Sequence, residues 1–193
     1  MSEIWAAAEA LSSPELQTRW VGVRRLIELG AHRTHPLVAY LLATRIMEND
    51  MALRARVIEA AADALTAGAN PAVFASLTHF LGGMRTRPIY ALLQAPIFDT
   101  NTEPLVATLL SYCSYAGDHL GEIAANRDAP IEVRIQAVSF IGRLGFLDAL
   151  PVLERLAARM DLRLNGRSPN LEKFDEANLL LQIRQVVELL KAP

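Results

Sequence analysis

The amino-acid sequence predicts an all-α protein, an α-solenoid of repeated helix pairs that ends in a capping helix. Two observations support this fold class. The segment 16–38 recurs as the segment 131–153, and matching positions lie 115 residues apart throughout. Aromatic residues make up only 6% of the chain, and the sequence lacks the runs of Val, Ile, Thr and Tyr that form strands. Because self-similarity at a fixed offset is the signature of a repeat protein, we expect the repeated unit to be a helix pair.

The two repeated segments share the residues that start and end helices. Each has an arginine near the start of its first helix, a glycine that can end this helix in the left-handed conformation, and a proline that opens the second helix. One helix pair cannot bury its apolar face alone, so we expect the pairs to stack on one another. The matching positions are Arg19 with Arg134, Gly30 with Gly145, Pro36 with Pro151 and Leu41 with Leu156.

The segment 13–48 is expected to form the first helix pair. Its first helix begins near Pro14 after a serine cap and ends at Gly30, and its second helix runs from Pro36 to about Met47. Similar start and stop residues divide the rest of the chain. We expect further repeats at about 49–83, 84–127 and 128–160 and a capping helix at 171–190, all within a single domain spanning 1–193.

The third repeat, 84–127, is less regular than the others because it contains additional prolines. A short helix is expected at 88–95, followed by a loop at 96–102. A helix at 103–115 comes next, and Gly117 breaks it. The pairing of helices in this part of the chain stays open.

Composition and charge favour a cytoplasmic protein that binds neither nucleic acid nor a membrane. The formal net charge is −2, so no global field attracts nucleic acid or an anionic lipid surface. The single cysteine, Cys113, excludes an intramolecular disulfide and fits a reducing compartment. The N-terminus lacks the features of a signal peptide, and no apolar run approaches the roughly 20 residues that span a bilayer.

The segment 129–153 carries a motif that resembles a HEAT repeat. The run Ala-Pro-Ile-Glu-Val-Arg at 129–134 supplies the proline start and the Val-Arg pair of that pattern. Leu144 and Gly145 supply its Leu-Gly pair, and Pro151 opens its second helix. The motif is most similar to the short bacterial HEAT-like repeats that are also found in phycobilin lyases.

The resemblance to HEAT repeats extends over much of the chain. The segment 14–48 is similar, with Arg19 in the arginine position, and the segment 50–81 fits more loosely. The segment 84–126 departs from the pattern, because it lacks the Val-Arg and Leu-Gly signatures. The resemblance implies a right-handed solenoid in which the second helix of each pair lines a concave surface.

The HEAT resemblance also implies a class of function. Solenoids of this kind commonly bind other proteins, so we expect a non-catalytic adaptor, scaffold or assembly factor that needs no cofactor. HEAT-like folds also include phycobilin lyases and alkylpurine DNA glycosylases, so an enzyme or a chromophore-handling protein is an alternative. Nucleic-acid binding through a local arginine patch is a further alternative.

The partner-binding residues are predicted on the second helices. The repeat offset aligns Arg155 with Tyr40 and Arg159 with Thr44. Because these positions carry charged side chains in the last repeat, we expect them to face solvent in both repeats. Tyr40 and Arg45 are then candidates for an inner surface, together with Arg155 and Arg159 of the last repeat. Exposed tyrosine and arginine are favoured anchors at interfaces. The alternative is that Tyr40 packs on the neighbouring repeat.

Other residues with reactive side chains are expected to be structural. His32 and His35 are expected to be surface histidines, because no further metal ligands lie at a suitable spacing. Cys113 is expected to be a buried, inert thiol, because no neighbouring base or cation in the sequence would lower its pKa. No catalytic, cofactor-binding or metal-binding residue is therefore predicted. His79 and His119 are isolated in the sequence, with no acid or nucleophile to act with them. The HEAT resemblance implies a structural role for the repeat arginines Arg19, Arg54 and Arg134.

Charge is unevenly distributed in the second half of the chain. The segment 88–126 has no lysine or arginine and a net charge of −4, whereas the segment 127–167 has a net charge of +2. Such a distribution could steer a charged partner, and it is also common on solvated faces.

Overall fold

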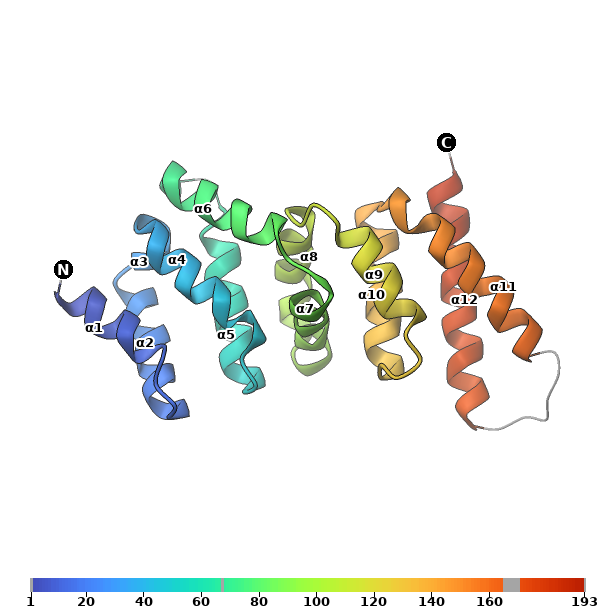
Figure 1. Cartoon of the computed structure of the whole chain (residues 1–193), viewed down its shortest axis with the longest axis horizontal. Coiled ribbons are helices and arrows are strands. Elements are labelled where there is room, and N and C mark those ends of the chain that lie inside the picture. Colours follow the sequence, from blue (N-terminus) through green and yellow to red (C-terminus); the bar gives the residue numbers. More distant parts are fainter. Residues whose placement is uncertain (1, 67, 165–170, 193) are drawn as a thin grey trace. The chain divides into compact units, whose positions relative to one another are not determined.

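The computed structural model describes residues 2–66, 68–164 and 171–192. Over these residues the chain forms twelve α-helices, three short 3₁₀ segments and no β-strand (Figure 1). The predicted all-α class is confirmed. The chain divides into two compact units, which are Met1–Met84 with Gln94–Ser114 and Arg85–Leu93 with Tyr115–Pro193. These are called the first unit and the second unit.

The first unit is a series of helices that pack against near neighbours in the sequence. Its elements are α1 (Ser2–Ala10), α2 (Leu16–Glu28), α3 (Ala31–Thr34), α4 (Pro36–Ala43), η1 (Thr44–Met47), α5 (Met51–Asp63), α6 (Pro71–Gly82), η2 (Thr100–Thr102) and α8 (Glu103–Ser111). α1 packs on α2, α4 packs on α5 and α6, and α5 packs on α8 (Figure 1). Leu26, Leu42, Leu53 and Leu77 are fully buried in its core.

The second unit contains the three longest helices that the structure describes. Its elements are the part of α7 (Thr86–Phe98) up to Leu93, α9 (Ala116–Ala125), α10 (Ile131–Leu144), η3 (Leu147–Ala149), α11 (Leu150–Leu164) and α12 (Leu171–Lys191). α10 and α11 each pack on α9 and on α12, and Phe140 is buried among them. No helix of the described ranges, α12 included, is long and apolar enough to cross a membrane.

The repeated residues occupy equivalent places in the two units. Arg19 is the fourth residue of α2, and Arg134 is the fourth residue of α10. Gly30 and Gly145 follow these helices, with φ angles of 63° and 70°. A side chain is disfavoured in this left-handed conformation, so a glycine is the residue that ends each helix there.

The start of the first expected helix differs from the sequence prediction. α2 begins at Leu16, and its N-terminus has no side-chain cap. The hydroxyl of Ser13 accepts a hydrogen bond from the amide of Glu15, 3.2 Å away, within the turn that precedes the helix. Before that turn lies α1, which we did not predict from the sequence. Its residues Ala7 and Ala8 are buried.

The irregular third repeat contains a longer helix than expected. α7 (Thr86–Phe98) replaces the predicted short helix at 88–95, and it continues through Pro96. Proline fixes φ at a helical value, and in the last turn it costs one backbone hydrogen bond without ending the helix. The buried residues Leu92, Leu93 and Ala95 favour the helical conformation up to that point, because it places them in the cores.

Candidate interaction surfaces

The first repeat arginine binds backbone and carboxylate groups at the same time. Nη1 of Arg19 donates to the carbonyl oxygens of Ser13 and Pro14, both 2.9 Å away. Its Nε and Nη2 donate to the two carboxylate oxygens of Glu48 at 2.9 and 3.0 Å. The Arg19 side chain therefore ties the turn before α2 to the turn before α5.

The other two repeat arginines are buried and bind carbonyl groups in the same way. Nε of Arg54 donates to the carbonyl of Glu48 at 2.8 Å, and its Nη1 donates to the side chain of Gln94 at 2.7 Å. Nε of Arg134 donates to the carbonyl of Ala124 at 3.0 Å. Burial lowers the pKa of both guanidinium groups. These contacts give the repeat arginines a role in packing.

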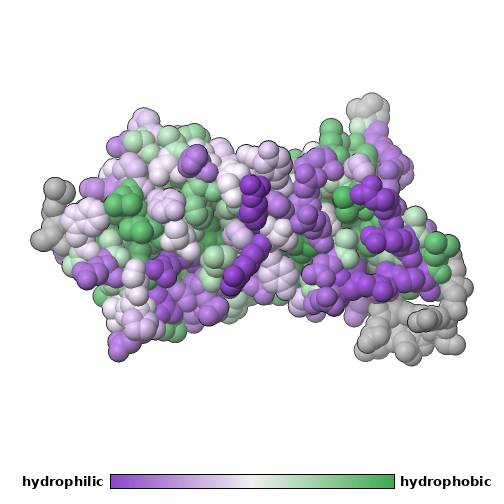
Figure 2. Space-filling view, viewed as in Figure 1, coloured by the Kyte–Doolittle hydropathy of each residue, from purple (hydrophilic) through white to green (hydrophobic). Residues whose placement is uncertain are grey.

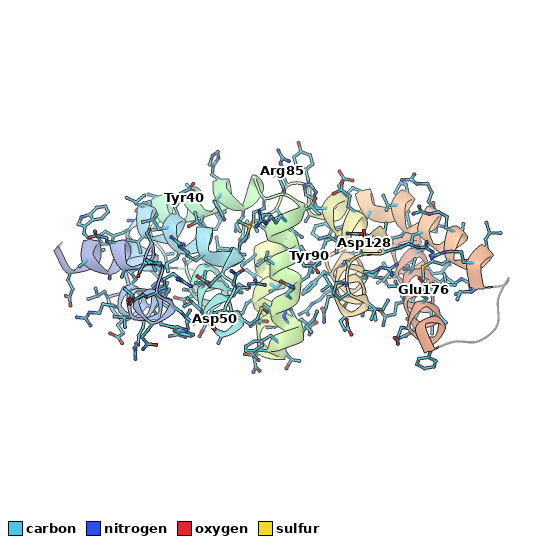
Figure 3. All side chains as sticks on the ribbon, turned by 60° about the horizontal axis from the view of Figure 1, so that its bottom comes forward. Tyr40, Asp50, Arg85, Tyr90, Asp128 and Glu176 are labelled. Carbon is cyan, nitrogen blue, oxygen red and sulfur yellow. The ribbon has the colours of Figure 1, made fainter. Side chains whose placement is uncertain are left out.

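Tyr40 lies on α4 (Figure 3) and is partly exposed to solvent. Its ring meets that of Phe80 on α6, with centroids 5.5 Å apart and planes at 87°. Leu37, one turn earlier on the same face of α4, is 49% exposed, and Tyr40 is 42% exposed. Figure 2 shows hydrophobic residues gathered over α4. Leu37, Tyr40 and Phe80 are called the α4–α6 surface.

Arg45, the second predicted partner-binding residue of the first unit, contacts another residue of that unit. It lies in η1 and is half-buried. Its Nη2 donates to the hydroxyl of Ser12 at 3.3 Å, and its buried Nε has no hydrogen-bond partner among the described residues. Arg45 therefore contacts the turn after α1 and offers less free surface than Tyr40.

Arg155 and Arg159 lie on α11 in the second unit, and both are exposed. They are one helical turn apart, so their side chains extend from the same face of α11. Tyr40 and Arg45 belong to the first unit, so each unit carries two of the four predicted residues.

His32 is buried, so its prediction as a surface histidine is wrong. The residue is 5% exposed, and Nε2 of its ring lies 2.7 Å from the carboxylate of Asp63. The single turn of α3 places the ring at the end of α5, where the carboxylate of Asp63 contacts one ring nitrogen. The rest of the ring is removed from water, as is common for a histidine with a partner. His35 is exposed, as expected.

His119 has partners that its isolated position in the sequence did not indicate. Its Nδ1 lies 2.9 Å from the hydroxyl of Thr86, which donates to Glu122 at 2.8 Å. This hydrogen bond, with the nearby His119, holds the pKa of Glu122 below its usual value. Beside it the guanidinium of Arg85 lies 5.8 Å from the ring centre of Tyr115 (Figure 3). These contacts join the start of α7 to α9 within the second unit.

Cys113 is buried, and its surroundings disfavour a role as a nucleophile. Its side chain is 5% exposed, with Sγ 3.4 Å from the carbonyl of Leu109 and 3.9 Å from Sδ of Met84. Burial raises the pKa of the thiol to about 12. The thiolate that nucleophilic chemistry requires is therefore disfavoured at neutral pH.

A groove of about 440 Å³ runs between α10 and α12. Its lining mixes amide, hydroxyl and guanidinium groups with aliphatic side chains. The lining residues are Ile135, Gln136, Val138, Ser139, Gly142, Arg143, Gln182, Gln185, Val186 and Leu189. Throughout the part of the chain that the structure describes, no three His, Cys, Asp or Glu side chains are placed to hold a metal ion.

Comparisons of the chain with protein-family models, with curated proteins and with solved structures find no match. The class that the fold and the surfaces define is an all-helical protein of two compact units. The first unit carries a partly aromatic surface on α4 and α6, and the second carries an exposed arginine pair on α11.

Sequence reasoning missed two residues beside the predicted ones. Phe80 contacts Tyr40 only because α4 packs on α6, and no spacing within one helix indicates this contact. Leu162 is 79% exposed on α11, seven residues after Arg155. It lay beyond the expected end of that helix near 160, although its heptad spacing from Arg155 was a usable signal.

Proposed function

We propose that this chain is a HEAT-like, right-handed α-solenoid that binds another protein without catalysing a reaction, as an adaptor, scaffold or assembly factor. The fixed 115-residue offset supports the repeat assignment. The equivalent places of Arg19 and Arg134, and of Gly30 and Gly145, support it further. The proposal places the chain in the cytoplasm, where a thiol such as that of Cys113 stays reduced.

The observation that carries the binding proposal is the α4–α6 surface. Tyr40 is 42% exposed, yet its orientation is fixed by the ring of Phe80. A rigid aromatic side chain offers a large contact area and loses little conformational entropy on binding. Leu37 lies beside it and extends the apolar area. An exposed tyrosine with these properties is a typical anchor of a protein interface.

A photocrosslinking experiment tests this proposal. Tyr40 is replaced by benzoylphenylalanine in the full chain, and Tyr115, which is 53% exposed in the second unit, is replaced in a matched control. We expect irradiation in cells to give a discrete adduct with another protein from position 40 and not from position 115. Adducts of equal yield and pattern from both positions would contradict the proposal.

A further inference from the structure

We propose that the exposed face of α11 binds an acidic amphipathic helix of the partner protein. This inference deepens the proposed function, on which it rests, by giving the chemical class of one contact. The face consists of Arg155, Arg159 and Leu162, which are all exposed. Their i, i+4, i+7 spacing places them in one stripe along the helix.

Every other charged residue of α11 is paired with α12. Glu154 accepts from Lys191 at 2.7 Å, and Arg163 lies 3.4 Å from Glu176 (labelled in Figure 3). Asp161 forms a further pair with Arg184, with both carboxylate oxygens bound, at 2.6 and 2.7 Å. The two carboxylates of α11 are therefore occupied by cations of another helix.

Arg155 and Arg159 are left without a counterion on this helix. In the ranges that the structure describes, neither guanidinium has an ion-pair partner. Like charges one turn apart disfavour a helix, so the fold itself gains nothing from this pair. Figure 2 shows hydrophilic residues gathered over α11. A ligand with two carboxylates supplies the missing charge, and each guanidinium can bind one of them with two hydrogen bonds.

The spacing of the stripe fits a helix. Four residues of a helix rise about 6 Å and seven rise about 10.5 Å. A second helix lying along α11 matches these intervals with glutamate or aspartate at i and i+4 and an apolar residue at i+7. Leu162, at 79% exposure, supplies the apolar contact. A phosphate backbone would leave Leu162 without a partner, and nucleic-acid interfaces usually engage more cations than two.

A peptide-binding assay on the full chain tests the inference. The probe is a fluorescent peptide of about 20 residues, long enough to be helical, that repeats Glu-Ala-Ala-Ala-Glu-Ala-Ala-Leu. A second peptide carries Gln at each Glu position, and single-stranded oligo-dT is the third probe. We expect the Glu peptide to bind at least about tenfold more tightly than the Gln peptide at low salt, a preference that rising salt weakens.

Three variants locate the binding face. Arg155→Gln with Arg159→Gln removes the preference for the Glu peptide. Leu162→Ser weakens both peptides. The matched control, Arg24→Gln with Arg56→Gln, removes two arginines of the first unit and leaves the preference within about twofold of wild type. The inference is overturned if the Glu peptide shows no preference, or if the preference survives the double substitution on α11. Tighter binding of oligo-dT that the same substitution abolishes also overturns it, in favour of nucleic acid.

Failure of this inference can be told apart from failure of the proposed function. A partner that crosslinks at position 40 and binds equally well to the α11 double variant leaves the proposed function standing and removes the acidic helix. The absence of any crosslinked partner at position 40 removes the proposed function itself.

Discussion

The rings of Tyr40 and Phe80 meet almost at right angles, with their centroids 5.5 Å apart, and this contact joins α4 to α6. Tyr40 is nevertheless 42% exposed. The two roles considered for it from the sequence, packing on a neighbouring helix and facing solvent, are therefore compatible. The Tyr40 ring contacts Phe80 on one side, and the exposed part of the Tyr40 side chain remains available to a partner.

Arg19→Ala should destabilise the fold by about 3 kcal/mol. The carboxylate of Glu48 is 7% exposed and would lose two donors, and a buried charge without its partner is costly. Urea denaturation of the full chain measures the change. Arg25→Ala is the control, because Arg25 and Glu3 form an exposed pair, and it should leave the denaturation midpoint unchanged. Equal effects of the two substitutions would contradict this assignment.

Gly142→Ala should separate α10 from α12 and cost about 1–3 kcal/mol. A Cβ atom at this position would lie 2.8 Å from Cγ2 of Val186. Because Val186→Ala removes that methyl group, the double variant should recover part of the loss, and a double-mutant cycle by urea denaturation measures the coupling. Strictly additive effects would show that the two residues do not determine how closely the helices approach.

Cys113 should react slowly with thiol reagents in the native state. Its pKa of about 12 disfavours the reactive thiolate at neutral pH, and its burial prevents a reagent from reaching the sulfur atom. Labelling with Ellman's reagent at neutral pH should be far slower for the folded chain than for the chain in denaturant. Cys113→Ala should leave partner binding unchanged. Rapid stoichiometric labelling of the native protein would count against this account of the thiol.

Glu122 should titrate below the usual range of a glutamate, because Thr86 donates to its carboxylate. A carboxylate with a lower pKa in the folded state stabilises the fold above its unfolded pKa. That stabilisation is lost as the pH falls through the folded value. The effect on stability should be small, because the Glu122 side chain is 62% exposed.

A side-chain NMR titration of Glu122 checks this prediction. Thr86→Val removes the donor and should raise the pKa of Glu122 relative to wild type. Thr86→Ser keeps the hydroxyl and should preserve the lowered pKa. An unchanged titration in Thr86→Val would show that the hydrogen bond is not the main cause.

The parts of the fold that were predicted well depend on local chemistry. Proline and glycine act on the backbone within a few residues, which is why the start of α4 at Pro36 and the ends of α2 and α10 near Gly30 and Gly145 were predicted. α7 was expected to end before Pro96, because a proline usually stops a helix. The burial of Leu92 and Leu93 depends on contacts with neighbouring helices, and the local sequence pattern does not indicate these contacts.

The candidate surfaces were predicted in part for the same reason. The repeat offset indicated that Tyr40, Arg155 and Arg159 face solvent, and all three are exposed. The pairing of His32 with Asp63 joins residues 31 positions apart and depends on how α3 meets α5. The absence of free carboxylates on α11 likewise depends on α12, so only the packed structure distinguishes Arg155 and Arg159 from Arg163.

The central claim, that Tyr40 anchors a protein partner, is tested most directly by the dissociation constant of the protein that crosslinks at position 40. Tyr40→Ala should weaken this binding by about 1–4 kcal/mol, whereas Tyr115→Ala should not change it. The free energy of unfolding should fall by only about 1 kcal/mol, the scale of one aromatic ring contact. Unchanged binding together with a loss of several kcal/mol in stability would contradict the account, because Tyr40 would then be a residue of the core.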